Sequence, residues 1–375
     1  MAEPFKNLLN ADVVRHIGLH LQRAWPAFER QRFETQAQAG LEGLELKARA
    51  QHIADALQAC LPPAFAVAAD VMEAALAAPD DSLQAPMGAR DDGLAGWALW
   101  PLTEHVARHG HADVPRALQA LHAMTRRFSA EWAIRPFILQ HPALTFATLQ
   151  RWTQDPSAHV RRLVSEGSRP RLPWGQVLKP LIADPTPTLP LLEALQDDPS
   201  EYVRRSVANH LNDIAKDHPS LIVQWLQQHL PGAHAHRRAL LRHACRGLIK
   251  QGHAQVLAAW GTGAPLQGQA RLQLHPARIT LGESLEFQVT LSNATQGPQP
   301  LVVDYAVHHV KASGRTSPKV FKGWNLTLAP GEQRALRKQH AVRPITTRRY
   351  HPGTHRVQLL VNGEAVAEAA FDLVL

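Results

Sequence analysis

One segment of the chain places arginine, amide and carboxylate side chains at helical spacing. Residues 198–219, DPSEYVRRSVANHLNDIAKDHP, read as a helix with one apolar stripe and one polar face. The apolar stripe consists of Val203, Val207, Leu211 and Ile214. The opposite face holds Arg205, Asn209, Asn212 and Lys216, with Asp213 at its edge. Arginine suits phosphate, whereas a carboxylate adds nothing to phosphate binding, so the acid indicates chemistry beyond the capture of an anion.

An earlier stretch of the chain repeats this pattern. Residues 155–169 read DPSAHVRRLVSEGSR and residues 198–212 read DPSEYVRRSVANHLN, an offset of 43 residues. A weaker relative, HRRALLRHACRGLIK, occupies residues 236–250. The offset lies within the range of about 40–47 residues that is typical of HEAT-type helical hairpins. Stacked hairpins of this kind predict an α-solenoid with one continuous face of arginines, carboxylates and amides.

Several classes of chemistry find no support in the sequence. Two cysteines, Cys60 and Cys245, cannot build a zinc cluster and indicate no disulfide framework. We find no phosphate loop, no dinucleotide fingerprint and no serine in a nucleophile elbow. No apolar run approaches the roughly 18 residues of a membrane span, and the N-terminus lacks a signal pattern. We therefore expect a cytoplasmic protein without a metal or cofactor.

The net charge of +8 is unevenly distributed along the chain. Residues 1–110 carry 14 Asp or Glu against 9 Lys or Arg, so this part is acidic. Residues 111–265 carry 18 Lys or Arg against 11 Asp or Glu, and residues 266–375 carry 13 against 7. The second and third parts are therefore compatible with a polyanion such as nucleic acid, while the first is not.

The period of the hydrophobic pattern changes near residue 265. Residues 1–78 look helical, residues 79–95 form a loop rich in Pro, Gly and Asp, and helices then continue to about Trp260. After GTGAPLQGQ, residues 261–269, six or seven short segments alternate apolar and polar residues. These segments predict an all-β immunoglobulin-like sandwich, with a small barrel as the alternative.

The predicted architecture is therefore an α-helical part followed by an all-β part. We expect a HEAT-like α-solenoid over residues 1–262, a linker over 263–269 and the sandwich over 270–375. Within the sandwich, basic residues concentrate in two stretches that look like turns, KASGRTSPKVFK (311–322) and RPITTRRYHPG (343–353). Arginine-bearing loops at one end of a sandwich suit the minor groove of DNA.

Four segments of the helical part, together with one near the N-terminus, carry a family resemblance. They read SAEWAIRPFI (129–138), RRLVSEGSRPRLPW (161–174), YVRRSVANHLNDIAKDHP (202–219), RHACRGLIKQG (242–252) and FETQAQAGLEGLELKARAQHIADAL in the first 60 residues. They resemble the AlkC branch of the HEAT-like-repeat alkylpurine DNA glycosylases, over roughly residues 5–262. Some members of that family continue into an immunoglobulin-like domain, which agrees with the predicted sandwich.

The resemblance implies removal of N-methylated bases, chiefly 3-methyladenine, from double-stranded DNA, without flipping the base into a pocket. A 3-methylated adenine is cationic and leaves without a general acid. Positive charge then grows on the deoxyribose, where a carboxylate can stabilise it and orient the attacking water. An aromatic face can add CH–π and cation–π contacts. The sequence does not rank 3-methyladenine against 3-methylcytosine or 1-methyladenine.

The family motifs assign candidate residues to these roles. The candidate catalytic acids are Asp213, Glu131 and Glu166, and Trp174 is the candidate aromatic residue. The candidate DNA-binding residues are Arg162, Arg169, Arg205, Asn209 and Arg242. The expected partner is damaged duplex DNA, bound by a monomer that associates with the nucleoid.

Two other functions remain open on the sequence. One is a catalytically silent HEAT-repeat scaffold that binds DNA or protein, since an α-solenoid is a general recognition surface. The other is an adaptor in which the sandwich does the binding. Carboxylates on the arginine-lined face distinguish the glycosylase from the first alternative, because Glu166 and Asp213 add nothing to a pure phosphate-binding groove.

Overall fold

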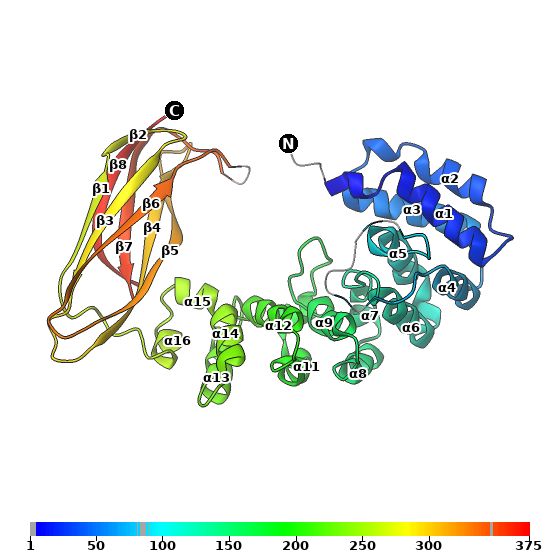
Figure 1. The fold of residues 1–375 in the computed structure, drawn as a ribbon, viewed down its shortest axis with the longest axis horizontal. Helices are drawn as coiled ribbons and strands as arrows, with labels where there is room; N and C mark the ends of the chain where they lie inside the picture. The colour runs from blue at the N-terminus through cyan, green and yellow to red at the C-terminus, as the bar shows by residue number, and fades with distance from the viewer. Residues whose placement is uncertain (1–4, 81, 83–87, 89, 346–347) are drawn as a thin grey trace. The chain divides into compact units, whose positions relative to one another are not determined.

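The computed structural model of the chain describes all residues except 1–4, 81, 83–87, 89 and 346–347. Within the described residues, α-helices come first and β-strands follow (Figure 1). The α-helices are α1 (Ala11–Ala24), α2 (Arg30–Gln38), α3 (Leu46–Cys60), α4 (Phe65–Ala74), α5 (Leu99–His109), α6 (Val114–Thr125), α7 (Arg135–Gln140), α8 (Pro142–Trp152), α9 (Ala158–Gly167), α10 (Lys179–Ala183), α11 (Leu189–Leu195), α12 (Glu201–Ile214), α13 (Pro219–His229), α14 (Ala235–Ala244), α15 (Arg246–Lys250) and α16 (Ala254–Ala259). The strands are β1 (Ala270–His275), β2 (Arg278–Thr280), β3 (Ser284–Ser292), β4 (Gln299–Val310), β5 (Thr316–Leu328), β6 (Gln333–Ala341), β7 (Gly353–Val361) and β8 (Glu364–Val374).

This order of elements confirms the predicted fold class, a helical array followed by an all-β immunoglobulin-like domain. The chain divides into two compact units, one of Met1–Asp217 with Ala235–Ala244, and one of His218–His234 with Cys245–Leu375. The second unit thus includes α13, α15 and α16 as well as all strands. The predicted division at residues 263–269 falls between the last helix and the first strand, and as a domain boundary it stays a prediction.

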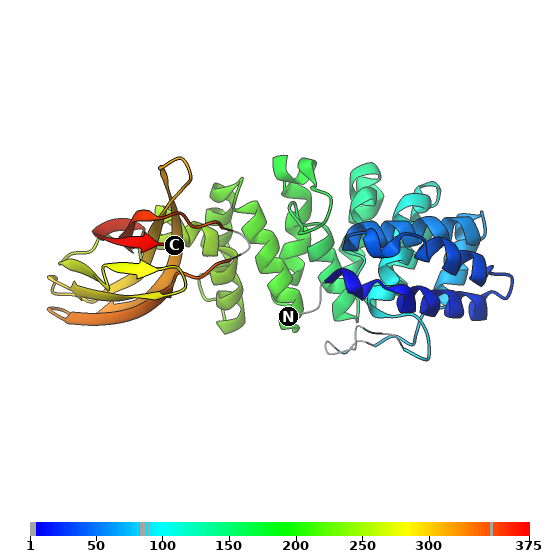
Figure 2. The same ribbon diagram turned by 90° about the horizontal axis from the view of Figure 1, so that it is seen from above.

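Neighbouring helices of the first unit pack against one another along the chain. The N-terminal helices α1 to α4, in blue, lie side by side in both views (Figure 1 and Figure 2). Farther along, α12 packs against α9 on one side and α14 on the other. The predicted apolar stripe of α12 is confirmed, because Val203, Val207, Leu211 and Ile214 are all buried. Burial of this stripe supplies most of the stability of such a helix.

The predicted polar face of α12 is only partly exposed. Arg205 and Lys216 are exposed, but Asn212 and Asp213 are buried. Two helices flank α12, and together they cover more of its circumference than a single packing face would. The expectation that the polar face of this helix is accessible is therefore wrong for Asn212 and Asp213. Any chemistry of Asp213 must take place at the edge of the packed interior.

The repeated DPS and VRR motifs have a structural explanation. Arg161 donates to the backbone carbonyls of Asp155 and Pro156, at the start of its own helix α9 (2.8 and 2.9 Å). Its equivalent on α12, Arg204, donates to the carbonyls of Asp198 and Pro199 in the same way. Arg161 also pairs with the Asp198 carboxylate, at 2.6 and 3.0 Å. The first arginine of each pair thus fixes the helix start, which leaves the second arginine for another role.

The strands form two sheets that face each other across a common core. One sheet has the order β1-β3-β6 and the other β2-β8-β7-β4-β5. Apolar side chains from both sheets, among them Phe287, Tyr305 and Phe371, make one buried cluster. All pairings are antiparallel except the short β2–β8 pair. Two packed sheets define a sandwich, so the small-barrel alternative is wrong.

Two details of the sandwich differ from the sequence prediction. The stretch 311–322 is not a turn throughout, because β5 begins at Thr316 and pairs with β4. Strand β6 was not among the predicted segments, since its sequence QRALRKQHA is dominated by polar and charged residues. Both strands lie at sheet edges, where one face contacts water and charged side chains are tolerated. The stretch 343–353 includes residues 346 and 347, which lie outside the described residues.

A close approach of two glycines joins α15 and the sandwich within the second unit. A Cβ atom on Gly252 would lie 2.6 Å from the Cα of Gly363, and one on Gly363 would lie 2.3 Å from the Cα of Gly252. Both residues have positive φ, 72° and 87°. Only glycine allows this contact without a shift of the backbone. The end of the helical region and the β7–β8 turn are therefore packed together.

Candidate active site

The three candidate acids come from three separate segments of the first unit. Glu131 precedes α7, Glu166 lies in the last turn of α9, and Asp213 lies near the end of α12. All three are buried, with 8, 6 and 2% of their surface exposed. A buried carboxylate is costly unless cations or hydrogen bonds compensate its charge. Each of these acids has such partners.

Two arginines alternate with the three acids. Arg162 donates through Nη1 to Glu131 Oε2, and its Nη2 lies 3.6 Å from Glu166 Oε1. Arg169 donates through Nη1 to Glu166 Oε1 at 2.6 Å and through Nε to Asp213 Oδ2 at 2.9 Å. The result is a continuous charge network, Glu131–Arg162–Glu166–Arg169–Asp213. The sequence analysis placed all five residues in the site, and the structure brings them together.

The network keeps its central acid ionised. Burial alone raises the pKa of Glu166, but the charges of Arg162 and Arg169 outweigh that effect and hold the pKa below its ordinary value. Ser206 on α12 adds a hydrogen bond from its Oγ to Glu166 Oε2, at 2.6 Å. Glu166 therefore carries its negative charge at neutral pH. A fixed anion of this kind can stabilise a cation but cannot act as a general acid.

Asp213 has one oxygen in the interior and one toward the surface. Its Oδ2 accepts from Arg169, while its Oδ1 accepts from Lys216 Nζ at 2.8 Å. The Lys216 side chain is 51% exposed. An exposed lysine is held by little energy and can turn to another anion. Oδ1 is thus the oxygen of the network that a small movement of one surface side chain would uncover.

Arg135 fixes the loop that carries Trp174. Its guanidinium is fully buried and donates to the backbone carbonyls of Gly167, Arg169, Pro170 and Gln176. Burial, together with the charge of Arg169, lowers the pKa of Arg135 to about 10, so it remains a cation at neutral pH. Because these acceptors lie on both sides of Trp174, the loop from α9 to α10 is held at two ends.

Trp174 is exposed in a conformation that few residues adopt. Its φ is +61°, in the left-handed region, and 57% of its surface is accessible. Such a conformation persists only where the surroundings impose it, and it is common at functional sites. The expectation that Trp174 is an available aromatic face agrees with this placement. Its ring lies 6.3 Å from Phe5 and 6.4 Å from Trp132, measured between ring centroids.

Trp132 connects Trp174 to a further group of aromatic side chains. Its ring stacks on Trp100 with centroids 4.3 Å apart, and its Nε1 donates to the carbonyl of Pro173 at 3.2 Å. Trp97 contacts Trp100 and Phe128 at 5.9 and 5.3 Å. Aromatic rings therefore continue from Trp174 into the helices that precede the acids.

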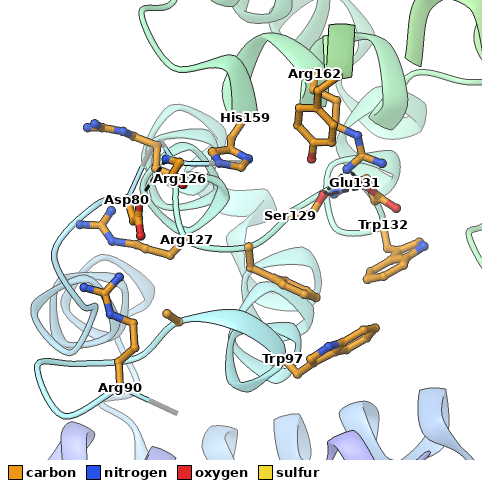
Figure 3. Close-up of a pocket in the computed structure, with 14 residues that line it drawn as sticks. Asp80, Arg90, Trp97, Arg126, Arg127, Ser129, Glu131, Trp132, His159 and Arg162 are labelled. Atoms are coloured by element: carbon orange, nitrogen blue, oxygen red, sulfur yellow. Dashed lines mark hydrogen bonds and ion pairs between the residues drawn. The ribbon is translucent and has the colours of Figure 1, made fainter. Parts of the chain in front are cut away.

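A pocket of about 250 Å³ opens beside the first acid of the network. Figure 3 shows Trp97 and Trp132 at one end of this pocket, next to Glu131 and Arg162. Arginines gather at the other end, namely Arg90, Arg126 and Arg127 (Figure 3). Tyr202 of α12 forms part of the wall, and the Arg162 guanidinium lies 5.2 Å from its ring centroid.

The remaining predicted DNA-binding residues lie apart from the charge network. Arg205 is on the surface of α12 and pairs with Glu201 at 2.6 Å. Asn209 is half-buried and its Oδ1 lies 2.9 Å from His243 Nε2, while Arg242 is half-buried on α14. Arg205 also lines a groove between α12 and α14, with Arg204 and His236. The structure thus separates the predicted arginines into two inside the network and two on the helix surfaces.

Sequence reasoning missed two residues that hold the site together. Arg135 lies in the quoted motif SAEWAIRPFI, but an arginine at the first position of a six-residue helix gives no sign of complete burial. Ser206 follows the VRR motif directly and looked like an ordinary helix residue. In the repeat, Ser206 corresponds to Leu163, a core residue. That substitution of a hydroxyl for an apolar side chain was the available signal.

In the described part of the chain, no group of three or more His, Cys, Asp and Glu residues has the arrangement of a metal site. Among the same residues, no helix combines the length and apolarity needed to span a bilayer. Cys60 and Cys245 are both buried, and neither forms a disulfide.

Comparisons with known proteins place the chain in a family. Residues 269–375 match the family model of the C-terminal immunoglobulin-like domain of the uncharacterised protein YhaZ. The YhaZ protein of Bacillus subtilis (strain 168) is 34% identical over 365 residues, which covers 96% of each chain. The alkylpurine DNA glycosylase AlkC of Pseudomonas fluorescens, in a structure bound to DNA with an abasic-site analogue, is 37% identical. It matches over 100% of both chains with a TM-score of 0.88. With its helical array, its charge network and its immunoglobulin-like domain, the chain belongs to the family of AlkC-type alkylpurine DNA glycosylases.

Proposed function

We propose that this protein is a DNA glycosylase that excises cationic N-methylated bases from duplex DNA. The observation that carries the proposal is the charge network, in a chain 37% identical over its full length to a glycosylase that was solved with an abasic-site analogue. Glycosidic bond cleavage needs negative charge beside a sugar that becomes cationic. Three carboxylates held in fixed positions meet that need without a cofactor.

Within this proposal, the arginines of the network position acids and do not bind phosphate. Arg162 and Arg169 each donate to two carboxylates, and their side chains are 18% and 10% exposed. The phosphate-binding role predicted for them passes to the surface cations, Arg205 and Lys216 foremost. A phosphate near Lys216 would draw its ammonium away from Asp213 and uncover Oδ1 for the sugar. Binding of the DNA backbone by Lys216 and exposure of Asp213 Oδ1 then occur together.

The proposed division of labour follows from the placement of each group. Asp213 Oδ1, at the surface edge of the network, stabilises the oxocarbenium-like sugar and orients water. Glu166 fixes Arg169 and keeps the local field negative. Glu131 holds Arg162 at the other end of the network and also lines the pocket. Trp174 offers an exposed aromatic face to the deoxyribose or the cationic base.

The substrates we propose are lesions that are positively charged before they leave. For 3-methyladenine, 3-methylcytosine and 1-methyladenine, the base is its own activated leaving group, so no general acid is required. This suits a site whose central carboxylate is held ionised. A neutral damaged base would need a proton donor. We propose further that the protein acts as a monomer on duplex DNA and leaves the base unflipped until the bond breaks.

One assay tests the function. Duplex DNA methylated with an alkylating agent is incubated with the full chain, and released bases are separated and identified, while undamaged duplex serves as the control. We expect release of 3-methyladenine and an equal yield of abasic sites. Tight binding to the same DNA without release of any base would favour the alternative, a scaffold that binds DNA and has no catalytic activity.

A further inference from the structure

The pocket beside Glu131 has no part in the catalytic scheme proposed above. It lies within the first unit and takes its walls from single residues between Asp80 and Trp97, from the segment 126–132 and from the helices α9 and α12. The residues of the first group are Asp80, Ser82, Arg90, Ala95 and Trp97. Its volume is about 250 Å³, and both apolar and polar groups line it. Because Glu131 is at once a lining residue and the first acid of the network, the pocket adjoins the charge network at the end opposite Asp213.

The aromatic end of the pocket offers a stacking surface for a flat ring. Trp97, Phe128 and Trp132 all line it. Trp97 and Phe128 have ring centroids 5.3 Å apart, and Phe128 and Trp132 6.3 Å apart, with tilts of 58° and 50°. Behind them Trp100, which is buried, stacks on Trp132 and holds its ring in place. Every nucleobase can stack on such a surface, whatever its hydrogen-bonding edge.

The charge of the pocket does not favour a cationic base. Among the described residues that line it, four arginines, Arg90, Arg126, Arg127 and Arg162, outnumber the two carboxylates of Asp80 and Glu131. Arg162 is paired with Glu131, and Arg90 is paired with Asp92 outside the lining. A cationic methylated base within the DNA therefore gains no net attraction from this lining. The same base becomes neutral when the glycosidic bond breaks, because the bonding electrons stay on its ring, and it can then bind by stacking.

We propose that this pocket is a nucleobase subsite that receives the purine after it leaves the deoxyribose. The inference rests on the proposed glycosylase function for the source of the base, but the ligand chemistry, a neutral purine ring stacked on Trp97, stands independently. Product capture of this kind keeps the base from recombining with the sugar cation while water attacks. It requires no base flipping before the bond breaks.

Binding of the free base gives the direct test. 3-Methyladenine and adenine are titrated into the full chain by calorimetry, with W97A and F128L as pocket variants and W152A, at a tryptophan outside this pocket, as the matched control. We expect saturable binding to the wild type and to W152A. Loss of one stacking partner should weaken it about tenfold or more in W97A. F128L keeps an apolar side chain, so its affinity for the free base should fall as well, but by less than that of W97A. Circular dichroism verifies the fold of each variant.

A second arm distinguishes a released base from one still attached to DNA. Affinities for a fully paired duplex and for a duplex with one bulged adenine are compared in the wild type and W97A. If the affinity for the bulged duplex depends on Trp97 and free bases do not bind, product capture is overturned. The pocket would then be assigned to an extrahelical base that is still attached to DNA. Free-base binding that is the same in the wild type, W97A and F128L would overturn the subsite altogether.

The outcome is separable from that of the proposed function. Free purine bound through Trp97 by a protein that releases nothing from methylated DNA would leave the subsite standing and refute the glycosylase. Normal excision by a protein that binds no free base would do the reverse. Under product capture, added 3-methyladenine should inhibit turnover of the wild type more strongly than that of W97A.

Discussion

The helical array and the sandwich both bury histidines, but they differ in their buried arginines and carboxylates. The described part of the array buries ion pairs between arginines and carboxylates, as in the network from Glu131 to Asp213. In the described sandwich, the buried titratable groups are the carboxylate of Asp304, the phenols of Tyr305 and Tyr350 and the imidazoles of His308, His309, His340 and His355. Buried ion pairs contribute little net stability, because desolvation offsets their attraction. Their concentration beside one surface loop therefore indicates chemistry, whereas the buried histidines of the sandwich indicate packing.

Neutralising the acids of the array should have the largest effect on activity. Asp213→Asn keeps the shape of the side chain but removes the charge that stabilises the sugar, so we expect single-turnover excision to fall by about 10²–10³. The excision rates of Glu131→Gln and Glu166→Gln should each fall by less than that of Asp213→Asn if Asp213 is the acid nearest the sugar. Binding to undamaged duplex should persist, since the change removes a repulsion from phosphate.

Two carboxylates serve as controls for this comparison. Glu201→Gln changes an exposed acid on the same helix as Asp213, and it should excise at the wild-type rate. Asp304→Asn changes the buried carboxylate of the sandwich, whose Oδ1 accepts from the Gly323 amide at 3.1 Å. We expect a lower melting temperature for that variant and an unchanged rate. Wild-type excision by Asp213→Asn would remove Asp213 from the mechanism.

The loop that Arg135 holds should give the next largest effect. Arg135→Met removes the donors to four backbone carbonyls on both sides of Trp174, and the loop should lose its fixed position. A displacement of about 1 Å at a reacting group costs up to 10²-fold in rate, so we expect a loss of about 10- to 100-fold. Arg135→Lys keeps the charge but has fewer donors. Its excision rate should lie between those of the wild type and Arg135→Met.

A positioning role for Arg135 can be separated from a general loss of stability. The rate at saturating DNA should fall more than the affinity for undamaged duplex, at a temperature well below the melting point of each variant. Acrylamide quenching, compared with and without the additional change Trp174→Phe, reports whether Trp174 becomes more accessible. Equal losses in rate and affinity, with unchanged quenching, would show that Arg135 only stabilises the fold.

Periodicity and turn residues were sufficient to predict the array and most of the sandwich. The stripe of α12 was predicted because one side of a helix meets a core at 3.6-residue spacing. The burial of Asn212 and Asp213 was not, because it depends on where α9 and α14 pack, and a single sequence does not specify that. Strand β6 was missed for a related reason, since an exposed edge strand tolerates charges that hide its alternation.

The candidate site shows the same limit at the level of side chains. Resemblance to a family identified Glu131, Glu166 and Asp213, and the repeat placed Arg162 and Arg205 at equivalent positions. The two arginines nevertheless have different partners, because Arg162 lies beside Glu131 and Glu166 while Arg205 contacts an exposed acid. Equivalent positions in a repeat determine on which face of its helix a side chain lies. The residues packed against that face determine which groups the side chain contacts.

Acidification should destabilise the elements of both regions that carry buried histidines. Burial lowers the pKa of His309 to about 3, with the charge of Arg348 acting in the same direction, and burial lowers the pKa of His340 to about 4. In the array, burial lowers the pKa of His105 to about 3 and that of His210 to about 4. A histidine whose folded pKa is depressed contributes stability above its unfolded pKa of about 6.5, and this is lost as pH falls below that value.

We therefore expect the melting temperature to fall by about 10 °C between pH 7 and pH 5. Over this window, the pairs of Glu166 with Arg162 and Arg169 persist, because these arginines hold the pKa of Glu166 below its ordinary value. Hydrogen exchange, resolved by element, should show loss of protection in β4 and β6, which carry His309 and His340, and in α12, which carries His210. Helix α2, which contains no histidine, should lose less. The variant His340→Gln should reduce the pH dependence. Equal loss in α2 and in these elements would contradict the assignment to histidines.

The smallest expected effects concern exposed cations. Arg205 pairs on the surface of α12 with Glu201, and such a pair contributes at most about 1 kcal/mol, so the guanidinium can turn to a phosphate. Lys322 on β5 and Arg337 on β6 are exposed basic residues of the sandwich. Each phosphate contact that is lost should lower the slope of log K against log salt by about one. Changing each of the three to Gln, one at a time, measures which region contacts the DNA backbone.

Arg15→Gln is the control, because this arginine lies in the acidic first third and pairs with Asp12. We expect a reduced slope for Arg205→Gln, the same weakening on any DNA sequence and no change for Arg15→Gln. A reduction for Lys322→Gln or Arg337→Gln as well would add the sandwich to the DNA-binding surface. An unchanged slope for Arg205→Gln would exclude the exposed face of α12.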